Sequence, residues 1–392
     1  MSGNQPVVVN DHKQRKLTWF KIDIRAYTMI AALVFIWIYF AMMSDAFLTT
    51  RNLSNLFLQM SVTAILAIGM VLIIVAGQID LSVGSLMGLT GGIAAILNVW
   101  YDWDTIPVII ATLAAGALIG LFQGWVVAYQ AVPAFIVTLG GMLIFRGILL
   151  GITDSVTIAP LSEDLRFMGQ SYVDKNIGYL LAIAAFVILV FLQIRRRQSR
   201  VKYGFDVAPY LILFGKLAFF GIFIGGFVYL MNDYKGIPVP FILVIILAII
   251  FTFIAKNTIF GRHVYALGGN ADAARLSGIN IKRRILLVFV LGNTLAAIAG
   301  LVYTARLNAA TSGAGEMYEL DAIAACVIGG TSLMGGVGTI SGAIIGALVM
   351  ASLDNGMSIM NIESFWQQIV KGSILVVAVW IDIYSRRKSK QA

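Results

Sequence analysis

KNTIFGRHVYALGGNADAARLSGINIKRR, residues 256–284, interrupts a chain that is otherwise strongly apolar. Six residues of this stretch are basic and only Asp272 is acidic. A segment this polar cannot lie in hydrocarbon, and its basic residues place it on the cytoplasmic side of a membrane. Asn270 is a candidate N-cap and Gly278 a candidate stop for a short helix. The stretch therefore predicts a capped cytoplasmic helix held between two membrane spans.

The composition indicates a polytopic membrane protein. Its 392 residues are 59% hydrophobic and only 12% charged, whereas soluble domains carry about 25% charged residues. Many apolar runs approach the length of about 20 residues that a membrane helix needs, which favours helices over a barrel. The polar, basic start of the chain lacks the apolar run of a cleaved signal peptide. The single cysteine, Cys326, excludes an internal disulfide, and the two histidines lack partners at metal-ligand spacing.

Lys and Arg are distributed unevenly along the chain, and this asymmetry predicts the topology. Twenty of the 28 fall in segments expected inside the cell, five in segments expected outside and three within spans. The positive-inside rule then places both termini in the cytoplasm and requires an even number of crossings. The same clustering explains the net charge of +9 without nucleic acid as a partner.

We expect an all-α polytopic membrane protein with about ten to twelve transmembrane helices. A membrane domain (residues 26–384) follows a cytoplasmic tail (1–25) and precedes a basic tail (385–392). The candidate spans are residues 26–44, 58–77, 84–100, 106–129, 133–152, 177–194, 207–231, 239–255, 285–304, 320–334, 338–353 and 365–383. Of these, 84–100 and 320–334 are short and rich in glycine, which leaves the count between ten and twelve.

Two regions of the chain resemble each other. QIDLSVGSLMGLTGG begins at Gln78 and ELDAIAACVIGGTSLMGG at Glu319; each opens with an aspartate and runs into paired glycines. Each is followed by a span with glycines four residues apart, which lets helix backbones approach closely. The predicted topology gives the two regions opposite orientations, which indicates an inverted repeat of residues 58–152 and 285–383. A hairpin (177–231) and the polar stretch 256–284 lie between the two repeats.

Polar residues in or beside the expected spans are candidates for lining or gating a path. They are Asp80, Gln123, Arg146, Asn293, Asp321, Thr331, Ser332 and Lys371. Asp80 and Asp321 precede glycine-rich helices, where a carboxylate either caps the helix or contacts substrate or a gating partner. Lys371 lies well inside its span and needs a partner or water. We expect it to pair with an acid such as Asp354 or Glu363.

The other candidates have equally simple structural explanations. Arg146 lies near the end of its span, where a long side chain reaches the interface as readily as it lines a path. Gln123, Asn293, Thr331 and Ser332 are either part of a polar path or hydrogen-bond neighbouring helices. These alternatives stay open at the level of sequence.

The sequence carries no motif of an enzyme. It lacks HExxH and GxSxG, and its only Gly-Lys pair, Gly215-Lys216, has no P-loop around it. We therefore expect no cofactor and no metal in this chain. Without a ring of one charge along any span, a neutral solute is the favoured cargo.

Three stretches, residues 78–92, 261–284 and 319–348, resemble the permease subunits of bacterial ABC uptake systems for monosaccharides, the ribose, xylose and arabinose group. The three motifs occur in the same order, and the resemblance covers nearly the whole chain. Residues 177–231 add about two spans to the shorter ribose-type pattern. This longer form is similar to the xylose-type members of the family, so the resemblance implies D-xylose as the favoured sugar.

The resemblance also implies partners. A cytoplasmic ABC ATPase carries the ATP and Mg²⁺, a periplasmic or extracellular sugar-binding protein delivers the sugar, and a second permease copy completes a homodimer in the lipid of the bacterial inner membrane. The ATPase is expected to grip a coupling helix made by Gly268, Gly269, Asn270, Ala273, Ala274, Arg275, Leu276, Ser277 and Gly278. In this interpretation Ala273, Ala274 and Leu276 form an apolar face and Arg275 a polar anchor.

Three other functions remain open. The first is the same architecture carrying another solute, such as a different sugar, a branched-chain amino acid or an autoinducer. The second is a free-standing secondary transporter, which predicts intramembrane acids for ion coupling and no docking helix. The third, an intramembrane enzyme, would need a nucleophile–base pair that the sequence lacks.

Overall fold

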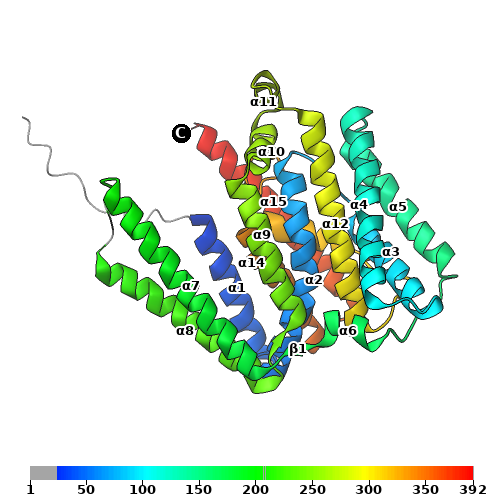
Figure 1. Ribbon diagram of the computed structural model, residues 1–392, viewed down its shortest axis with the longest axis horizontal. Coiled ribbons are helices and arrows are strands. Elements are labelled where there is room, and N and C mark those ends of the chain that lie inside the picture. The colour runs from blue at the N-terminus through cyan, green and yellow to red at the C-terminus, as the bar shows by residue number, and fades with distance from the viewer. Residues whose placement is uncertain (1–23, 206, 208, 392) are drawn as a thin grey trace, which may run out of the picture.

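A computed structural model describes residues 24–205, 207 and 209–391, and these form a bundle of helices (Figure 1). The expected tail at residues 1–25 lies almost wholly outside the described residues. The first helices are α1 (Ile24–Met43), α2 (Thr50–Val75), α3 (Val83–Ala95) with a π-helical turn (Ile96–Trp100), α4 (Thr105–Tyr129), α5 (Ala134–Ile152) and α6 (Glu163–Gln170).

A helical hairpin follows, flanked by two short strands. Its elements are β1 (Tyr172–Val173), α7 (Lys175–Lys202), α8 (Tyr210–Tyr234) and β2 (Ile237–Pro238). The remaining helices are α9 (Val239–Asn257), α10 (Ile259–Gly269), α11 (Ala271–Leu276), α12 (Ile281–Leu307), α13 (Tyr318–Ile328), α14 (Ile340–Ile359) and α15 (Ser364–Gln391).

In the described part of the chain, ten helices are long and apolar enough to cross a membrane. They are α2, α3 with its π-helical turn, α4, α5, α7, α8, α9, α12, α14 and α15, the last as Ser364–Tyr384. Helix α1 adds a shorter apolar stretch, Met29–Met43. The all-α polytopic fold is confirmed, and residues 84–100 form one of the candidate spans.

The expected span at residues 320–334 is wrong. Helix α13 has 11 residues, which at about 1.5 Å per residue covers roughly half of a hydrocarbon core about 30 Å thick. The chain then leaves the helix at Gly329 and Gly330, and residues 331–339 connect it to α14 without helix. The paired glycines Gly329 and Gly330, which fell inside the expected span, instead end the helix.

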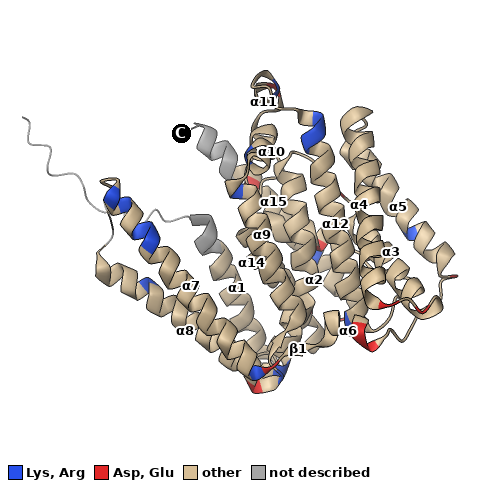
Figure 2. Cartoon of the chain, viewed as in Figure 1, with Lys and Arg blue, Asp and Glu red and all other residues tan. Residues whose placement is uncertain are grey.

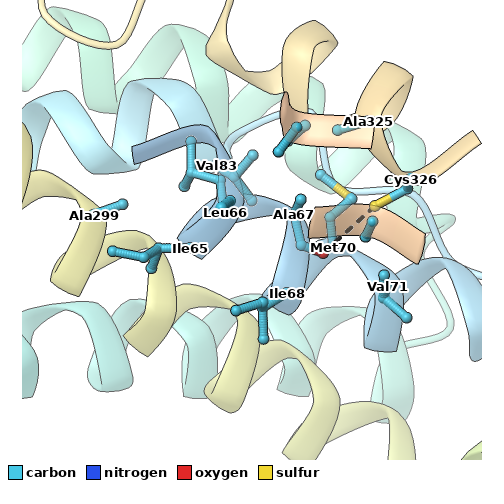
Figure 3. Close-up of a cluster of buried hydrophobic side chains, with 14 of the residues drawn as sticks. Ile65, Leu66, Ala67, Ile68, Met70, Val71, Val83, Ala299, Ala325 and Cys326 are labelled. Carbon is cyan, nitrogen blue, oxygen red and sulfur yellow. Dashed lines mark hydrogen bonds between the residues drawn. The ribbon is translucent and has the colours of Figure 1, made fainter. Parts of the chain in front are cut away.

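Helix α2 is the centre of the bundle. In its most apolar 18-residue window, 94% of residues are buried, because α8, α9, α12, α13 and α14 all pack against it. Figure 3 shows Ile65, Leu66 and Met70 of α2 among buried side chains of neighbouring helices. A helix that is apolar on every side is stable only when it is enclosed in this way.

Glycines spaced four apart set how closely the helices approach. A Cβ at Gly116, Gly120 or Gly124 of α4 would lie 2.6–2.9 Å from atoms of α12, so a larger side chain would force these helices apart. In α14, Gly346 faces the backbone of Ala325 in α13, and Gly342 faces the backbone of Gly329 directly after α13. The expected stripe of α4 is therefore confirmed, and that of α14 is confirmed for Gly342 and Gly346, whereas Gly338 lies before the helix and meets Thr331 and Val75. The inverted repeat remains a prediction.

The hairpin of α7 and α8 lies at the side of the bundle and leans away from it (Figure 1). Only 6% of the apolar window of α7 is buried, and 11% of that of α8. The two strands pair antiparallel at its base, with Val173 opposite Ile237. The hairpin is thus attached mainly at one end.

Basic residues predominate at the end of the bundle near α11, whereas the opposite end, around β1 and α6, carries both signs. Figure 2 shows Lys and Arg at the upper end of α7 and at the start of α12, near α11, and acidic residues on α6 at the opposite end. This distribution agrees with the positive-inside expectation.

Candidate functional site

The stretch that opened the sequence analysis folds as two short helices, α10 and α11, at one end of the bundle (Figure 1). We call them the projecting unit. Thr258 caps α10 by accepting a hydrogen bond from the Gly261 amide at 3.1 Å. Asn270 caps α11 by accepting one from the Ala273 amide at 3.0 Å, and Gly278 leaves the helix with φ +80°. Both caps expected for this helix are confirmed.

The exposed surface of α11 differs in part from the expected one. Leu276 is 89% exposed, and Ala273, Arg275 and Ser277 are exposed as well. Ala274 is only 4% exposed and faces the rest of the protein. Its place in a docking face is therefore wrong: Ala274 supports the helix from within, because α11 is so short that one side must rest on the chain beneath it.

The projecting unit contacts two parts of the membrane core through backbone atoms: the end of α2 and the α13–α14 connection. A Cβ at Gly268 would overlap the carbonyl oxygen of Val75, the last residue of α2, and would lie 2.6 Å from the Gly336 amide nitrogen. The Gly336 amide in turn donates to the Val75 carbonyl at 2.9 Å. Gly269 has no neighbour within 4 Å of such a Cβ. The end of α10 thus touches α2 and the α13–α14 connection together.

A second contact ties α10 to the same connection. The Tyr265 hydroxyl donates to the Gly338 carbonyl oxygen at 2.7 Å. Burial raises the pKa of this phenol above its ordinary value, so the hydroxyl remains a donor at neutral pH. Helix α10 is therefore in direct contact with the end of α2 and with the connection that precedes α14.

Three of the expected path residues join a buried hydrogen-bond network inside the bundle. The Ser82 hydroxyl donates to Asp80 at 2.6 Å, and the Gln123 amide donates to that hydroxyl at 2.9 Å. The Asn293 amide donates to Gln123 at 2.6 Å. All four side chains are at most 2% exposed. The network links α4, α12 and the segment before α3. Helix-to-helix hydrogen bonding is the observed role of Gln123 and Asn293.

Lys371 of α15 pairs with two carboxylates from other helices. Its ammonium lies 3.0 Å from Asp321 of α13 and 2.8 Å from Asp354 of α14. The expected partner Asp354 is confirmed and Glu363 is not the partner. The expectation that Asp321 precedes its helix is wrong: it is the fourth residue of α13, where its carboxylate turns to Lys371.

The remaining candidates are spread over the bundle. Arg146 lies 3.8 Å from Glu316, and both side chains are well exposed, so the pair adds little stability. Thr331 and Ser332 are fully buried in the α13–α14 connection. The Ser332 hydroxyl accepts from the Met334 amide at 3.2 Å, so it shapes the connection.

The described part of the chain also encloses two hollows, one beside the Lys371 cluster and one apart from it. One of about 290 Å³ is bounded by α13, α14 and α15 and includes Asp321 and Lys371 in its wall. The other, of about 360 Å³, lies near β1 and the end of α12 and includes Tyr172 and Arg306. Among the described residues, no group of three His, Cys, Asp or Glu is placed to hold a metal ion.

Sequence reasoning missed the contacts that depend on packing. Ser82 was not singled out, although it bridges Asp80 and Gln123, and neither was Gly336. The signal for Gly336 is the glycine-rich run GGVG at residues 335–338, which does not by itself indicate a partner.

Comparisons with known proteins give a consistent result. A model of the family described as "Branched-chain amino acid transport system / permease component" matches residues 52–379. The xylose transport system permease protein XylH of Haemophilus influenzae is 49% identical over 368 residues, which cover 94% of this chain and 98% of the relative. XylH of Escherichia coli is 48% identical, with 94% of each chain covered. The ribose import permease protein RbsC of Escherichia coli is 38% identical, with 91% and 92% covered. No solved structure matches the chain.

Proposed function

The chain belongs to the family of membrane permeases described as the permease component of branched-chain amino acid transport systems, and from that premise we propose that it is the membrane-spanning subunit of an ATP-binding-cassette importer for D-xylose. The observation that carries the mechanism is the projecting unit, whose exposed helix sits on the ends of two core elements. The protein itself is a multi-pass membrane transport component. ATP and Mg²⁺ belong to a separate cytoplasmic ATPase.

Coupling follows from the shape of the projecting unit. The ATPase grips α11 at its exposed residues, with Leu276 entering an apolar groove and Arg275 supplying a charged contact. A partner drives a conformational change only if it binds the two states with different free energy. Gly268 lies in close contact with Val75 at the end of α2 and with Gly336 in the connection before α14. In this proposal, displacement of α10 therefore shifts α2 relative to the start of α14.

The choice of cargo rests on the relatives and on charge. Those named for xylose are 48–49% identical over nearly the whole chain, and one named for ribose is 38% identical. The charged side chains of the described core include the ammonium of Lys371 between the carboxylates of Asp321 and Asp354, and the separate carboxylate of Asp80; they do not form a ring of one sign. That arrangement suits a neutral sugar better than an ion.

The remaining partners complete the proposal. A sugar-binding protein outside the cell delivers xylose, a second copy of this chain forms the other half of the membrane assembly, and bacterial inner-membrane lipid surrounds both. Basic residues gather on the side of the projecting unit, which favours cytoplasmic placement of that unit and of both termini.

Transport by reconstituted vesicles tests the proposal. We expect radiolabelled xylose to enter proteoliposomes only when the ATPase, the sugar-binding protein and ATP are all present. Uptake by this chain alone without ATP would identify a secondary transporter instead. Preference for a different solute under the same conditions would retain the ABC mechanism but refute xylose as cargo.

Substitutions on α11 test the docking surface. Leu276→Glu and Arg275→Glu should each reduce co-purification of the ATPase at least tenfold, while membrane insertion is unchanged because both residues are exposed. Tyr203→Glu, a change at a 71% exposed residue after α7, is the matched control and should leave ATPase binding intact. Normal ATPase recruitment by both α11 variants would remove α11 as the docking site.

A further inference from the structure

Helix α15 carries a polar face within its membrane span. Ser364, Gln367, Gln368 and Lys371 recur three or four residues apart, so they lie on one side of the helix. Gln368 is exposed and Lys371 is 22% exposed, although the helix packs against α13 and α14. Amide and ammonium groups are costly against lipid, so within a membrane such a face borders a water-filled space or a polar ligand.

The hollow of about 290 Å³ lies against this face. Its polar wall consists of Glu316, Asp321, Ser364, Gln367, Gln368 and Lys371. Its apolar wall includes Leu320, Met350 and Leu375. A volume at the low end of the range for small-molecule sites, roughly 300–1,000 Å³, suits a ligand smaller than a drug. Amides, carboxylates and an ammonium suit hydroxyl groups, and the apolar wall suits a C–H surface.

The charges in the wall disfavour an anionic ligand, because carboxylates outnumber the single ammonium of Lys371. Two carboxylates hold the Lys371 ammonium, at 2.8 and 3.0 Å, and an ammonium has three donors. One donor therefore remains for a ligand hydroxyl, while the paired charges leave no free cation to hold an anion. The Gln368 amide supplies both a donor and an acceptor.

We propose that this hollow is a transit site for a monosaccharide, bound by hydroxyl contacts to Gln367, Gln368 and Lys371 on α15. The inference rests on the proposed sugar import and adds the place in this chain through which the sugar moves. Because Asp321 and Asp354 connect Lys371 to α13 and α14, movement of these helices opens or closes the site.

Gly372 allows the site to be blocked with a matched control. It lines the hollow, and a Cβ there has no neighbour within 4 Å. In vesicles holding the complete transporter, Gly372→Leu should lower xylose uptake at least tenfold and leave ATP hydrolysis stimulated by the binding protein within twofold. Ser373→Leu adds the same side chain at the next residue, outside the hollow, and should change both rates less than twofold.

Other outcomes of this experiment overturn the inference. Uptake by Gly372→Leu at the parent rate would mean that sugar does not pass here. An equal loss of uptake and ATP hydrolysis would mean that the residue acts on structure. Failure of the parent complex to import xylose is a separate result, since it refutes the proposed cargo before any variant is compared.

Cysteine labelling gives a readout that does not need transport. The only native cysteine, Cys326, is fully buried, so Gly372→Cys presents one accessible thiol. Millimolar xylose should slow its reaction with a water-soluble methanethiosulfonate at least threefold relative to NaCl of equal osmolarity, and Ser373→Cys should show no such protection. Equal labelling rates of Gly372→Cys in xylose and in NaCl would overturn the inference.

Discussion

At the scale of single residues, Lys371 joins three helices through one ammonium group. Asp321 and Asp354 reach it from α13 and α14, at 3.0 and 2.8 Å. A charged group in the membrane interior is tolerated when it is paired. Removing one member of such a pair leaves the remaining charge without a partner, which is destabilising. The cluster is therefore sensitive to which of its members is lost.

This asymmetry gives a prediction for stability. Lys371→Met leaves two facing carboxylates and should lower the free energy of unfolding by about 1–3 kcal/mol, which is less than the cost of breaking a fully buried ion pair because Lys371 and Asp354 are 22% and 31% exposed. Asp354→Asn should cost clearly less, because the Lys371–Asp321 pair remains. Unfolding by titrated detergent measures both. A milder effect for Lys371→Met than for Asp354→Asn would show that the ammonium is not held as described.

The buried amide pair gives a second prediction at this scale. Gln123 and Asn293 share a hydrogen bond of 2.6 Å, so Gln123→Leu and Asn293→Leu should each destabilise the protein, but their effects should not add. A double-mutant cycle should give a coupling energy of about 0.6–1.7 kcal/mol, the range for hydrogen bonds between membrane helices. Additive losses would contradict an energetic link between α4 and α12.

At the scale of elements, the projecting unit depends on the absence of side chains where it meets the core. Gly268 lies against Val75 and Gly336, and no Cβ fits between them. The neighbouring Gly269 borders open space. Two adjacent glycines on one helix thus differ only in what they face.

That difference predicts opposite results for one chemical change. Gly268→Ala should push α10 away from α2 and reduce xylose uptake at least tenfold in the assembled transporter, with ATPase still bound to the exposed α11. Gly269→Ala should retain uptake within twofold. Uptake and ATPase co-purification measured together distinguish loss of transmission from loss of docking, and normal uptake by Gly268→Ala would contradict transmission through this contact.

At the scale of the whole molecule, the α7–α8 hairpin is an appendage to the bundle. Its helices are mostly unburied, and its attachment consists of α8 against α2 and a small cluster that includes Leu53, Val228 and Met231. Because β1 and β2 pair, the chain enters and leaves the hairpin at neighbouring points.

Removal of the hairpin tests this description. Replacing residues 174–236 with an Asn-Gly turn should preserve membrane insertion and xylose uptake within about threefold, since such a turn favours closure of antiparallel strands. The melting temperature should fall, because Leu53 loses its cover. Complete loss of uptake by a correctly inserted variant would give the hairpin a direct part in transport.

The sequence by itself determined the features that depend on a few neighbouring residues. Hydropathy predicted most of the spans, because the solvation of a segment depends on its own residues. The capping residues Asn270 and Gly278 predicted the limits of α11, because backbone hydrogen bonding at a helix end is local. The glycine stripes of α4 and α14 were also readable, since spacing of four fixes a helix face.

Only the tertiary structure decided which faces meet. It shortened α13, placed Asp321 inside that helix beside Lys371, 50 positions away in sequence, turned Ala274 inward and set Gly268 against Gly336. The physical reason is that periodicity defines a face but not the rotation and depth at which a helix packs. Those depend on the combined packing of all its neighbours, and in this molecule they determine which charges are paired and which glycines are indispensable.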